Sequence, residues 1–490
     1  MNNHVIIVQK EIYEYPHEGS FRPDKKYPEY PFREISDKKN SVYTMVREAF
    51  HLAGYDIENY ETNRWNPLGK FIKPGDTVLL KPNLVMDNNL SGDDVECLYT
   101  QPAVVAAVLD YVWIAIKSNR DKGKVIIGDA PVQECDFERL SAQSGYDRLI
   151  EWYRNKGCNV IYEDFRELKS IDKGGFYQSS IGETKGVVVD ITSDSEFSED
   201  SQEQLNRLRI TNYDPNLMKK HHNAIKHEYY ISKQIISADV IINMPKPKTH
   251  RKAGITISLK NLVGISARKE YLPHHTIGSI KENGDEYLAP SFLKYWKGKI
   301  LDKRNFYMQT AKKYSMAKIL SLVICIFNLI IRFTGGDTYS EGNWYGNDTI
   351  SRTIIDLNKI ILYADKEGKL QSDLQRKYLI VADMIQSGEG EGEGPIMPSA
   401  KKLGVIAVGD NSVCFDEVIA TLMGAKLSSV PTLYRARHPR GRYKLVAEDC
   451  RPEIISNQIC LNKKLIEELG SNDKWNFLPA KGWEKVFDRI

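Results

Sequence analysis

The apolar positions of this chain fall into short continuous runs, separated in several places by stretches with helical spacing. The runs are rich in Val, Ile and Leu, and they lie at 77–81, 125–128, 159–162, 186–191, 239–243, 378–382 and 404–408, with a further first strand in VIIVQ near the N-terminus. Apolar residues at helical spacing predict helices near 42–54 and over about 102–117. Buried strands that alternate with helices indicate an α/β fold with a mostly parallel sheet covered by helices on both faces.

One of these runs ends in a loop that is crowded with cations and small polar residues. After the strand at 239–243 come Lys246, Lys248, Thr249, His250, Thr256, Ser258, Lys260 and Asn261. An apolar strand that ends in cations is how α/β proteins present an anion site at the carboxyl edge of a sheet. Burial and like charge both disfavour the ammonium form, so crowded lysines should lower each other's pKa. One lysine could then act as base or nucleophile, while the others hold phosphate or carboxylate.

His250 in the same loop is the candidate for proton transfer. If the strand continued through the loop, Lys246 and Lys248 would share one face, because they are two residues apart. The alternative interpretation is that the loop is an ordinary basic turn in solvent.

Polar residues also close other predicted strands. Lys81 and Asn83 end the strand at 77–81, and Asp129 ends the strand at 125–128. In an open parallel sheet such strand ends converge on one crevice, so these side chains are expected to meet the cationic loop. Asp129 could instead cap a helix or a turn.

An acidic, glycine-rich segment, GEGEGEGP, follows the strand at 378–382. Glycines let the backbone approach a ligand closely, and carboxylates in such a loop could hold a divalent metal such as Mg²⁺. The sequence therefore suggests a metal site formed by Asp383, Glu389 and Glu391, with a solvated hinge as the alternative. No motif for a nucleotide, a zinc ion or a nucleophilic serine is present in the sequence.

Four blocks of the chain together resemble the family known only as domain of unknown function 362. They are GDTVLLKPNLV (75–85), VIIGDAP (125–131), DVIINMPKPKTHRKAGITISLKNLVG (239–264) and, within 379–424, LIVADMIQSGEGEGEGP followed by GVIAVGDNSVCFDEVIATLMG. The resemblance implies that Asp416, and Glu389 or Glu391, face the same site, while His274 lies just beyond the third block and could add an acid or base. It implies no reaction, because the chemistry of the family is itself undefined.

The blocks also suggest how the chain is organised. Residues 71–284 and 346–450 are expected to form the α/β core of the resembled family. Residues 1–70 form an N-terminal extension, rich in Tyr and Pro, that packs on the core. Residues 285–345 form a basic and apolar helical insertion, and residues 451–490 form a C-terminal extension.

Composition narrows the classes of function. The 490 residues carry a net charge of only +3, which gives no global electrostatic argument for nucleic-acid binding. Seven scattered cysteines without a C-x-x-C predict no disulfide framework, no iron–sulfur cluster and a reducing compartment, although some relatives of the resembled family carry ferredoxin-type modules. The N-terminus lacks the pattern of a secretory signal, so we expect a cytoplasmic protein.

The helical insertion contains an apolar run at 319–331, flanked by many lysines and by Arg332. Thirteen residues in a helix rise about 20 Å, less than the roughly 30 Å of a hydrocarbon core, so a full membrane span is not expected. The run could be a buried or homo-oligomer-interface helix. Alternatively, residues 318–332 could lie on an anionic membrane surface.

Two functions follow from these observations. The first is an enzyme that acts on an anionic substrate, phosphorylated or carboxylated and small or lipid-linked, by proton or group transfer. The second is a non-catalytic protein of the membrane surface that binds a phosphorylated or lipid-linked ligand through the same loop. The varied Asn, Thr, Ser, His and Asp residues around the lysines favour the enzyme, because charge attraction alone would not require them.

Overall fold

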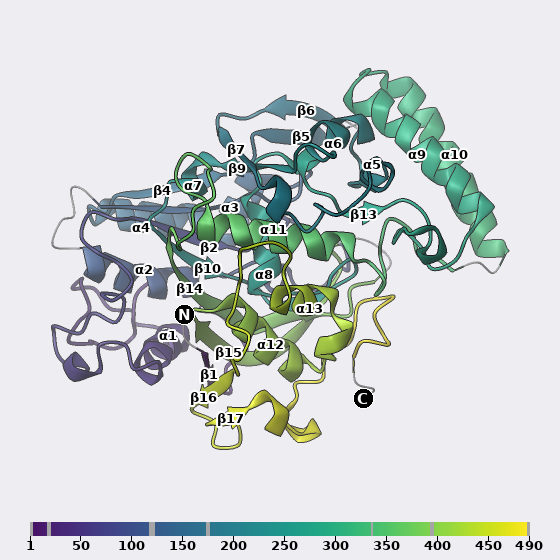
Figure 1. Cartoon of the computed structure of the whole chain (residues 1–490). Coiled ribbons are helices and arrows are strands. Elements are labelled where there is room, and N and C mark those ends of the chain that lie inside the picture. The colour runs from purple at the N-terminus through teal and green to yellow at the C-terminus, as the bar shows by residue number, and fades with distance from the viewer. Residues whose placement is uncertain are drawn as a thin grey trace.

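The computed structural model describes residues 3–16, 21–116, 123–172, 177–334, 337–392 and 396–487. A large mixed sheet runs through the molecule, and helices cover both of its faces (Figure 1). The prediction of an α/β fold with a mostly parallel sheet is therefore confirmed.

The strands of the main sheet lie in the order β17-β16-β1-β15-β14-β10-β2-β3-β4. Their bounds are β1 His4–Gln9, β2 Thr77–Pro82, β3 Lys124–Asp129, β4 Val160–Asp164, β10 Val240–Met244, β14 Lys377–Glu389, β15 Ser399–Gly409, β16 Glu453–Ser456 and β17 Lys464–Leu465. Strands β14, β10, β2, β3 and β4 run parallel to one another, whereas β15 runs antiparallel to both β14 and β1. The carboxyl ends of five parallel strands thus lie at one edge of the sheet.

The apolar run at 186–191 forms β7 Gly186–Asp190, but it does not join the main sheet. It pairs antiparallel with β9 Glu228–Ser232 as a separate two-stranded ribbon. Two further ribbons join β5 Leu168–Asp172 to β6 Tyr177–Ile181 and β8 Leu208–Arg209 to β13 His275–Thr276. Val189 is the one fully buried residue of β7, and such partial burial suits a ribbon better than a central strand of the sheet.

Helices of the described chain pack on the sheet or extend from it. They are α1 Ser41–Leu52, α2 Pro102–Ile116, α3 Phe137–Ser144, α4 Tyr146–Asn155, α5 Gln202–Leu205, α6 Pro215–His221, α7 Lys233–Ile236, α8 Ser258–Asn261, α9 Phe292–Gln309, α10 Tyr314–Phe333, α11 Thr349–Tyr363, α12 Ser412–Met423 and α13 Pro431–Arg437. Successive strand residues point to opposite faces, so Val78 and Leu80 pack in one core with α1, α2 and α4, whereas Leu79 packs in a second core with α11 and α12.

Both ends of the chain contribute strands to the sheet. Strand β1 pairs antiparallel with β15, where Ile6 lies opposite Val408, and parallel with β16, where Ile6 lies opposite Ile455. The first residues of the N-terminal extension therefore belong to the sheet itself, and so does part of the C-terminal extension.

Residues 194–197 of the acidic stretch at 193–204 are buried, whereas Ser198, Glu199 and residues 201–203 are exposed. Glu196 is fully buried and lies 2.7 Å from the Nζ of Lys359 on α11. Asp194 is also buried and forms an ion pair with Arg442. The cations that hold this segment come from distant parts of the sequence.

Helices α9 and α10 form an antiparallel hairpin that projects from the rest of the molecule (Figure 1). Helix α10 has 20 residues, longer than the apolar run alone, and is long and apolar enough to cross a membrane. Its described side chains are mostly exposed, including Leu322, Ile326, Leu329 and Phe333. The interpretation that this run is a helix buried within the chain is therefore wrong.

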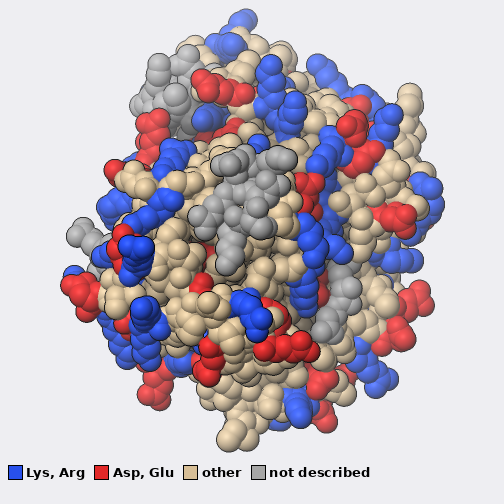
Figure 2. Space-filling view, turned by 90° about the vertical axis from the view of Figure 1, so that its left-hand side faces the viewer, with Lys and Arg blue, Asp and Glu red and all other residues tan. Residues whose placement is uncertain are grey.

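The face at the left of Figure 1 carries charges of both signs: Lys and Arg side chains are interspersed there with Asp and Glu side chains (Figure 2).

Candidate functional site

Strand β10 leads into a short hairpin at the carboxyl edge of the sheet. This hairpin consists of β11 Lys248–His250 and β12 Gly254–Thr256, and β11 also pairs with the end of β14. Lys248 lies opposite Thr256 in the antiparallel register. A Cβ atom at Gly388 of β14 would lie 3.2 Å from the Cβ of Lys248 and 3.0 Å from Pro398, so a glycine there lets the strands approach closely.

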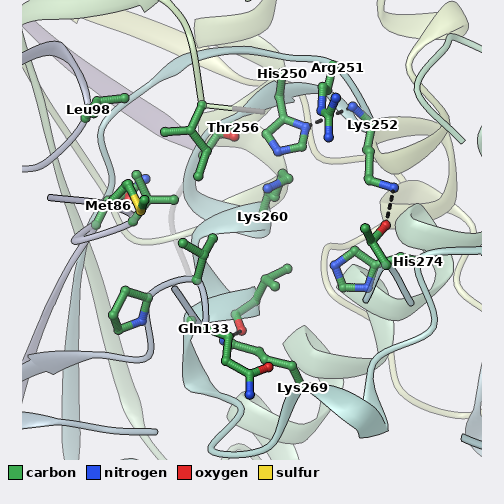
Figure 3. A pocket seen from close by; sticks show the side chains of 18 of the residues that line it. Met86, Leu98, Gln133, His250, Arg251, Lys252, Thr256, Lys260, Lys269 and His274 are labelled. Carbon is green, nitrogen blue, oxygen red and sulfur yellow. Dashed lines mark hydrogen bonds between the residues drawn. The ribbon is translucent and has the colours of Figure 1, made fainter. Parts of the chain in front are cut away.

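A cavity of about 410 Å³ opens beside this hairpin. Figure 3 shows side chains from several segments pointing into it, among them His250, Lys252, Lys260, Lys269 and His274. The predicted residues that line this cavity are Asn83, Asp129, Lys248, Thr249, His250, Thr256, Lys260, Asn261, His274 and Glu391. The expected convergence of distant strand ends thus holds for these ten residues.

Four lysines line the cavity, and burial lowers the pKa of each. Desolvation, with the nearby charges of Lys260 and Lys246, brings the pKa of Lys248 down to about 7. Desolvation likewise lowers the pKa of Lys269 to about 7 and the pKa values of Lys252 and Lys260 to about 8. A substantial fraction of neutral amine is therefore present near neutral pH, which supports the expectation that crowded lysines perturb one another.

The lysines differ in the contacts that hold their Nζ atoms. Lys248 donates to the carbonyl oxygen of Leu98 at 2.7 Å, and Lys269 donates to the carbonyl oxygen of Ala130 at 2.8 Å. Lys252 donates to the hydroxyl of Thr211 at 3.2 Å and to a backbone carbonyl. Within the described residues, Lys260 has neither a hydrogen bond nor an ion pair. Its ammonium group is thus available to a ligand.

The two histidines of the cavity are held in different tautomers. The Nδ1 of His250 accepts from the backbone N–H of Lys252 at 3.0 Å, so the ring proton of the neutral form is on Nε2. The Nδ1 of His274 lies 2.8 Å from the carbonyl oxygen of Leu272 and must donate to it, which leaves Nε2 as an acceptor. Desolvation and the surrounding cations lower the pKa of His250 well below its usual value and that of His274 to about 3. Both rings are neutral at pH 7.

Buried hydroxyl groups add polar atoms without a partner. The Oγ1 atoms of Thr249 and Thr256 are buried and have no hydrogen-bond partner among the described residues, and both threonines line the cavity. The Nε2 of Gln133, which also lines the cavity, is likewise buried without a hydrogen-bond partner among the described residues. Unsatisfied buried polar atoms are rare in folded proteins, and a bound polar ligand would satisfy them.

Lys81 lies directly behind the cavity wall. Its Nζ is 2.7 Å from Asp129 Oδ1 and donates to Asn261 Oδ1 at 3.1 Å. Asp129 also accepts the backbone N–H groups of Leu84 and Ala130. A Cβ atom at Gly264 would lie 2.0 Å from Asp129 Oδ1 and 2.7 Å from Lys81 Nζ, so only glycine fits against this ion pair. Asp129 therefore orders the strand ends as well as lining the cavity.

Lys246 does not line the cavity, although Lys248 does. The Nζ of Lys246 lies 3.0 Å from Asp383 Oδ2 and donates to the hydroxyl of Tyr15 at 2.6 Å, and both charged side chains are fully buried. The chain leaves β10 through Pro245 and Pro247, so it does not continue as a regular strand and the two lysines point to different sides. We therefore assign Lys246 and Asp383 to the support of the site and not to its surface.

Asp416 and Ser258 also lie behind the cavity. Asp416 accepts the backbone N–H groups of Ser258 at 2.9 Å and of Leu259 at 3.0 Å, and it accepts from the Ser258 hydroxyl. These bonds cap the N-terminus of α8, the short helix that carries Lys260. Desolvation raises the pKa of Asp416 to about 7. Both residues position the cavity without facing it.

The three acidic residues of the expected metal site do not come together. Asp383 pairs with Lys246, and Glu389 lies 3.1 Å from Lys401. Glu391 reaches the cavity but accepts the backbone N–H groups of Arg251 and Ile396. Among the described ranges, no group of three or more His, Cys, Asp or Glu side chains is arranged to hold a metal ion.

Several cavity residues escaped prediction. Arg251 and Lys252 belong to the cationic loop and could have been included on that ground, whereas Lys269 and Gln133 follow no motif in the sequence. Lys269 enters the cavity from the segment beyond α8, and Gln133 from the segment between β3 and α3. Only the folded chain brings these segments together.

Comparison with known proteins gives one curated relative. A thylakoid-associated protein of Synechocystis sp. is 30% identical over 197 residues, which cover 40% of this chain and 41% of the relative. The matched region thus spans about two fifths of that relative's length. No solved structure matches the chain significantly.

The family described as Domain of unknown function (DUF362) matches residues 78–190 and 168–421, a region that contains the sheet edge, the cationic hairpin and every predicted cavity residue. The matched ranges together cover well over half of the chain. The chain belongs to the DUF362 family.

Proposed function

We propose that the protein is an enzyme that acts on an anionic substrate, phosphorylated or carboxylated, in the cavity beside the β11–β12 hairpin. The observation that carries the proposal is the set of four lysines with lowered pKa around one cavity that also contains unpartnered threonine hydroxyls. Cations at a water-poor site bind anionic oxygens strongly, and the hydroxyl groups would fix the orientation of the ligand.

The roles follow from the contacts of each group. Lys260, Lys252 and Lys269 would hold the anionic oxygens, and Lys248 would accept a proton or attack as a neutral amine, because its pKa is about 7. His250 would donate the proton on Nε2 to the reacting oxygen. Proton transfer beside a carboxylate and transfer of a phosphoryl or acyl group both suit this arrangement.

Competitive labelling with limiting acetic anhydride tests the electrostatic basis of this proposal. The acetylation rate of Lys248, measured by mass spectrometry, should reach half its maximum near pH 7. Exposed Lys299 of α9 serves as the internal reference for labelling. Saturating sulfate should protect Lys248 and leave Lys299 unchanged. The proposal fails if Lys248 titrates with the surface lysines and sulfate gives no protection.

A second candidate is a non-catalytic protein that binds a phosphorylated or lipid-linked ligand at a membrane surface. The exposed apolar side chains of α10 favour it, and the relative from Synechocystis is described as thylakoid-associated. This candidate keeps the anion site but predicts no turnover. We propose the cytoplasmic face of a membrane as the location that suits both candidates, with anionic headgroups meeting the lysines of α9.

Native mass spectrometry of the purified protein separates the two candidates once it identifies a co-purified ligand. The enzyme should convert that ligand, and Lys248→Arg, which keeps the charge but cannot lose its proton, should abolish conversion while keeping affinity within about threefold. If wild-type protein binds the ligand and never converts it, the binding protein is correct.

A further inference from the structure

A second cavity, of about 370 Å³, lies between the α9–α10 hairpin and the core. Its charged lining side chains are Arg251, Lys294, Lys297, Arg304, Arg332, Lys481, Asp337 and Glu341. Six are cations and two are acids. Asp337 is paired with Lys294, and the carboxylate of Glu341 interacts with Lys252, Lys297 and Arg304. Six cations against two acids still leave an excess of positive charge in the cavity.

The fold holds several of these groups in place. Lys297 on α9 donates to Asn328 Oδ1 on α10 at 2.9 Å, which joins the two helices at the cavity. Arg304 donates to Asn212 Oδ1 at 2.6 Å, which ties α9 to the core. Positioned guanidinium and ammonium groups with planar or rotatable donors are the groups that proteins use to bind phosphate oxygens.

The second cavity adjoins the first. Arg251 and Asn212 line both cavities. Lys252 of the first cavity donates to the backbone carbonyl of Glu341, which lines the second. The two cavities thus share a wall, and a ligand in one lies close to a ligand in the other.

One side of the second cavity is apolar. Leu301, Ile324 and Ile331 line it, and Ile324 and Ile331 are among the few buried residues of α10. Other faces of α10 expose Leu322, Ile326 and Leu329. The cationic cavity therefore borders an apolar surface, which is the arrangement that fits the phosphate and the chain of an amphiphile.

We propose that the second cavity is a phosphate-binding subsite, whose ligand is a phosphate group presented either free or as the headgroup of a lipid. The lipid source rests on the membrane-surface proposal above, whereas the phosphate site itself does not.

Titration calorimetry with inorganic phosphate tests the subsite. The titrations use the Lys260→Ala variant, because removing Lys260 weakens anion binding in the first cavity. Phosphate binding in the second cavity can then be followed. Adding Lys297→Ala with Arg332→Ala should weaken the remaining phosphate binding at least tenfold, because two of the six cations are removed. The matched control is Lys299→Ala with Lys303→Ala, which removes the same charge from exposed positions of α9 outside the cavity.

Equal phosphate affinity in these two double variants overturns the proposal, and selective loss in the first supports it. Vesicles with phosphatidic acid or with an equal fraction of phosphatidylglycerol then identify the source. A preference for phosphatidic acid that Lys297→Ala with Arg332→Ala abolishes assigns the phosphate to a lipid headgroup, whereas no preference assigns it to a soluble molecule. Acetylation of Lys248 is measured separately, so failure of the subsite and failure of the enzyme proposal are distinguishable.

Discussion

Lys248 and Thr256 lie opposite each other across the β11–β12 hairpin, and both line the same cavity. The ammonium group of Lys248 is buried and donates to a backbone carbonyl, and no carboxylate lies within ion-pair distance among the described residues. A buried cation without an ion-pair partner lowers the stability of the fold. Ligand binding therefore explains the presence of Lys248 better than packing does.

Lys248→Met should therefore stabilise the protein at pH 6 by about 1–4 kcal/mol, because a buried charge is replaced by an apolar chain of similar length. The pKa of Lys248 is about 7 in the fold, against 10.5 in an unperturbed lysine. Between these values the unfolded chain binds more protons, so the free energy of unfolding of the wild type rises with pH. The Lys248→Met variant should lack the part of this increase with pH that comes from Lys248. Denaturant unfolding at pH 6 and pH 9 measures both effects, and a destabilised variant at pH 6 contradicts the argument.

Lys246→Met should have the opposite effect. Removing Lys246 leaves Asp383 buried and without its ion-pair partner, which costs about 3–5 kcal/mol. The double variant with Asp383→Leu should recover much of this loss, because both charges then leave the interior. A double-mutant cycle by denaturant unfolding gives the coupling energy, and additive effects of the two substitutions would refute the assignment of this pair to structural support.

Asp416→Ala should destabilise the protein by about 1–3 kcal/mol, because the backbone N–H groups of Ser258 and Leu259 lose their acceptor. Ser258→Ala removes only the hydroxyl contact and should cost less, about 1 kcal/mol. Because Asp416 caps α8, its loss should also weaken sulfate binding by Lys260. If the two variants lose equal stability and keep wild-type sulfate affinity, the cap has no such role.

Sulfate affinity should fall as the pH rises from about 6.5 to 8.5. Lys248 and Lys269 have pKa values of about 7, and Lys252 and Lys260 have values of about 8, so all four lose positive charge in this window. Sulfate itself keeps its charge, and the histidines stay neutral throughout. Calorimetric titration at fixed ionic strength measures the change. An affinity that is constant over this range would show that the lysines are not the ligands.

Apolar runs in the sequence located seven strands of the main sheet, because a continuous apolar run is a local property of a buried strand. The run at 186–191 instead forms a separate ribbon, and the sequence did not predict β16 and β17. The sequence also identified ten residues that line the cavity, because the ends of neighbouring strands converge in a parallel sheet. It could not separate Lys248 from Lys246, since the direction of each side chain depends on the path of the chain through Pro245 and Pro247. Nor could it find Lys269, whose place in the cavity is set by contacts far from any motif.

Membrane binding is the last property that the structure makes testable. Leu322 and Leu329 of α10 are 63% and 54% exposed, so aspartate at both positions should change the free energy of unfolding by less than about 1 kcal/mol in total. The same changes place two charges on the apolar face and should abolish sedimentation with anionic vesicles. Ile225 and Ile459, which are 83% and 95% exposed elsewhere on the molecule, provide a matched control when both are changed to aspartate. Vesicle binding that survives in the Leu322→Asp/Leu329→Asp variant, or that is lost equally in the control, would exclude the hairpin as the membrane contact. Wild-type binding that weakens as salt is raised would show in addition that the lysines around α10 meet anionic headgroups.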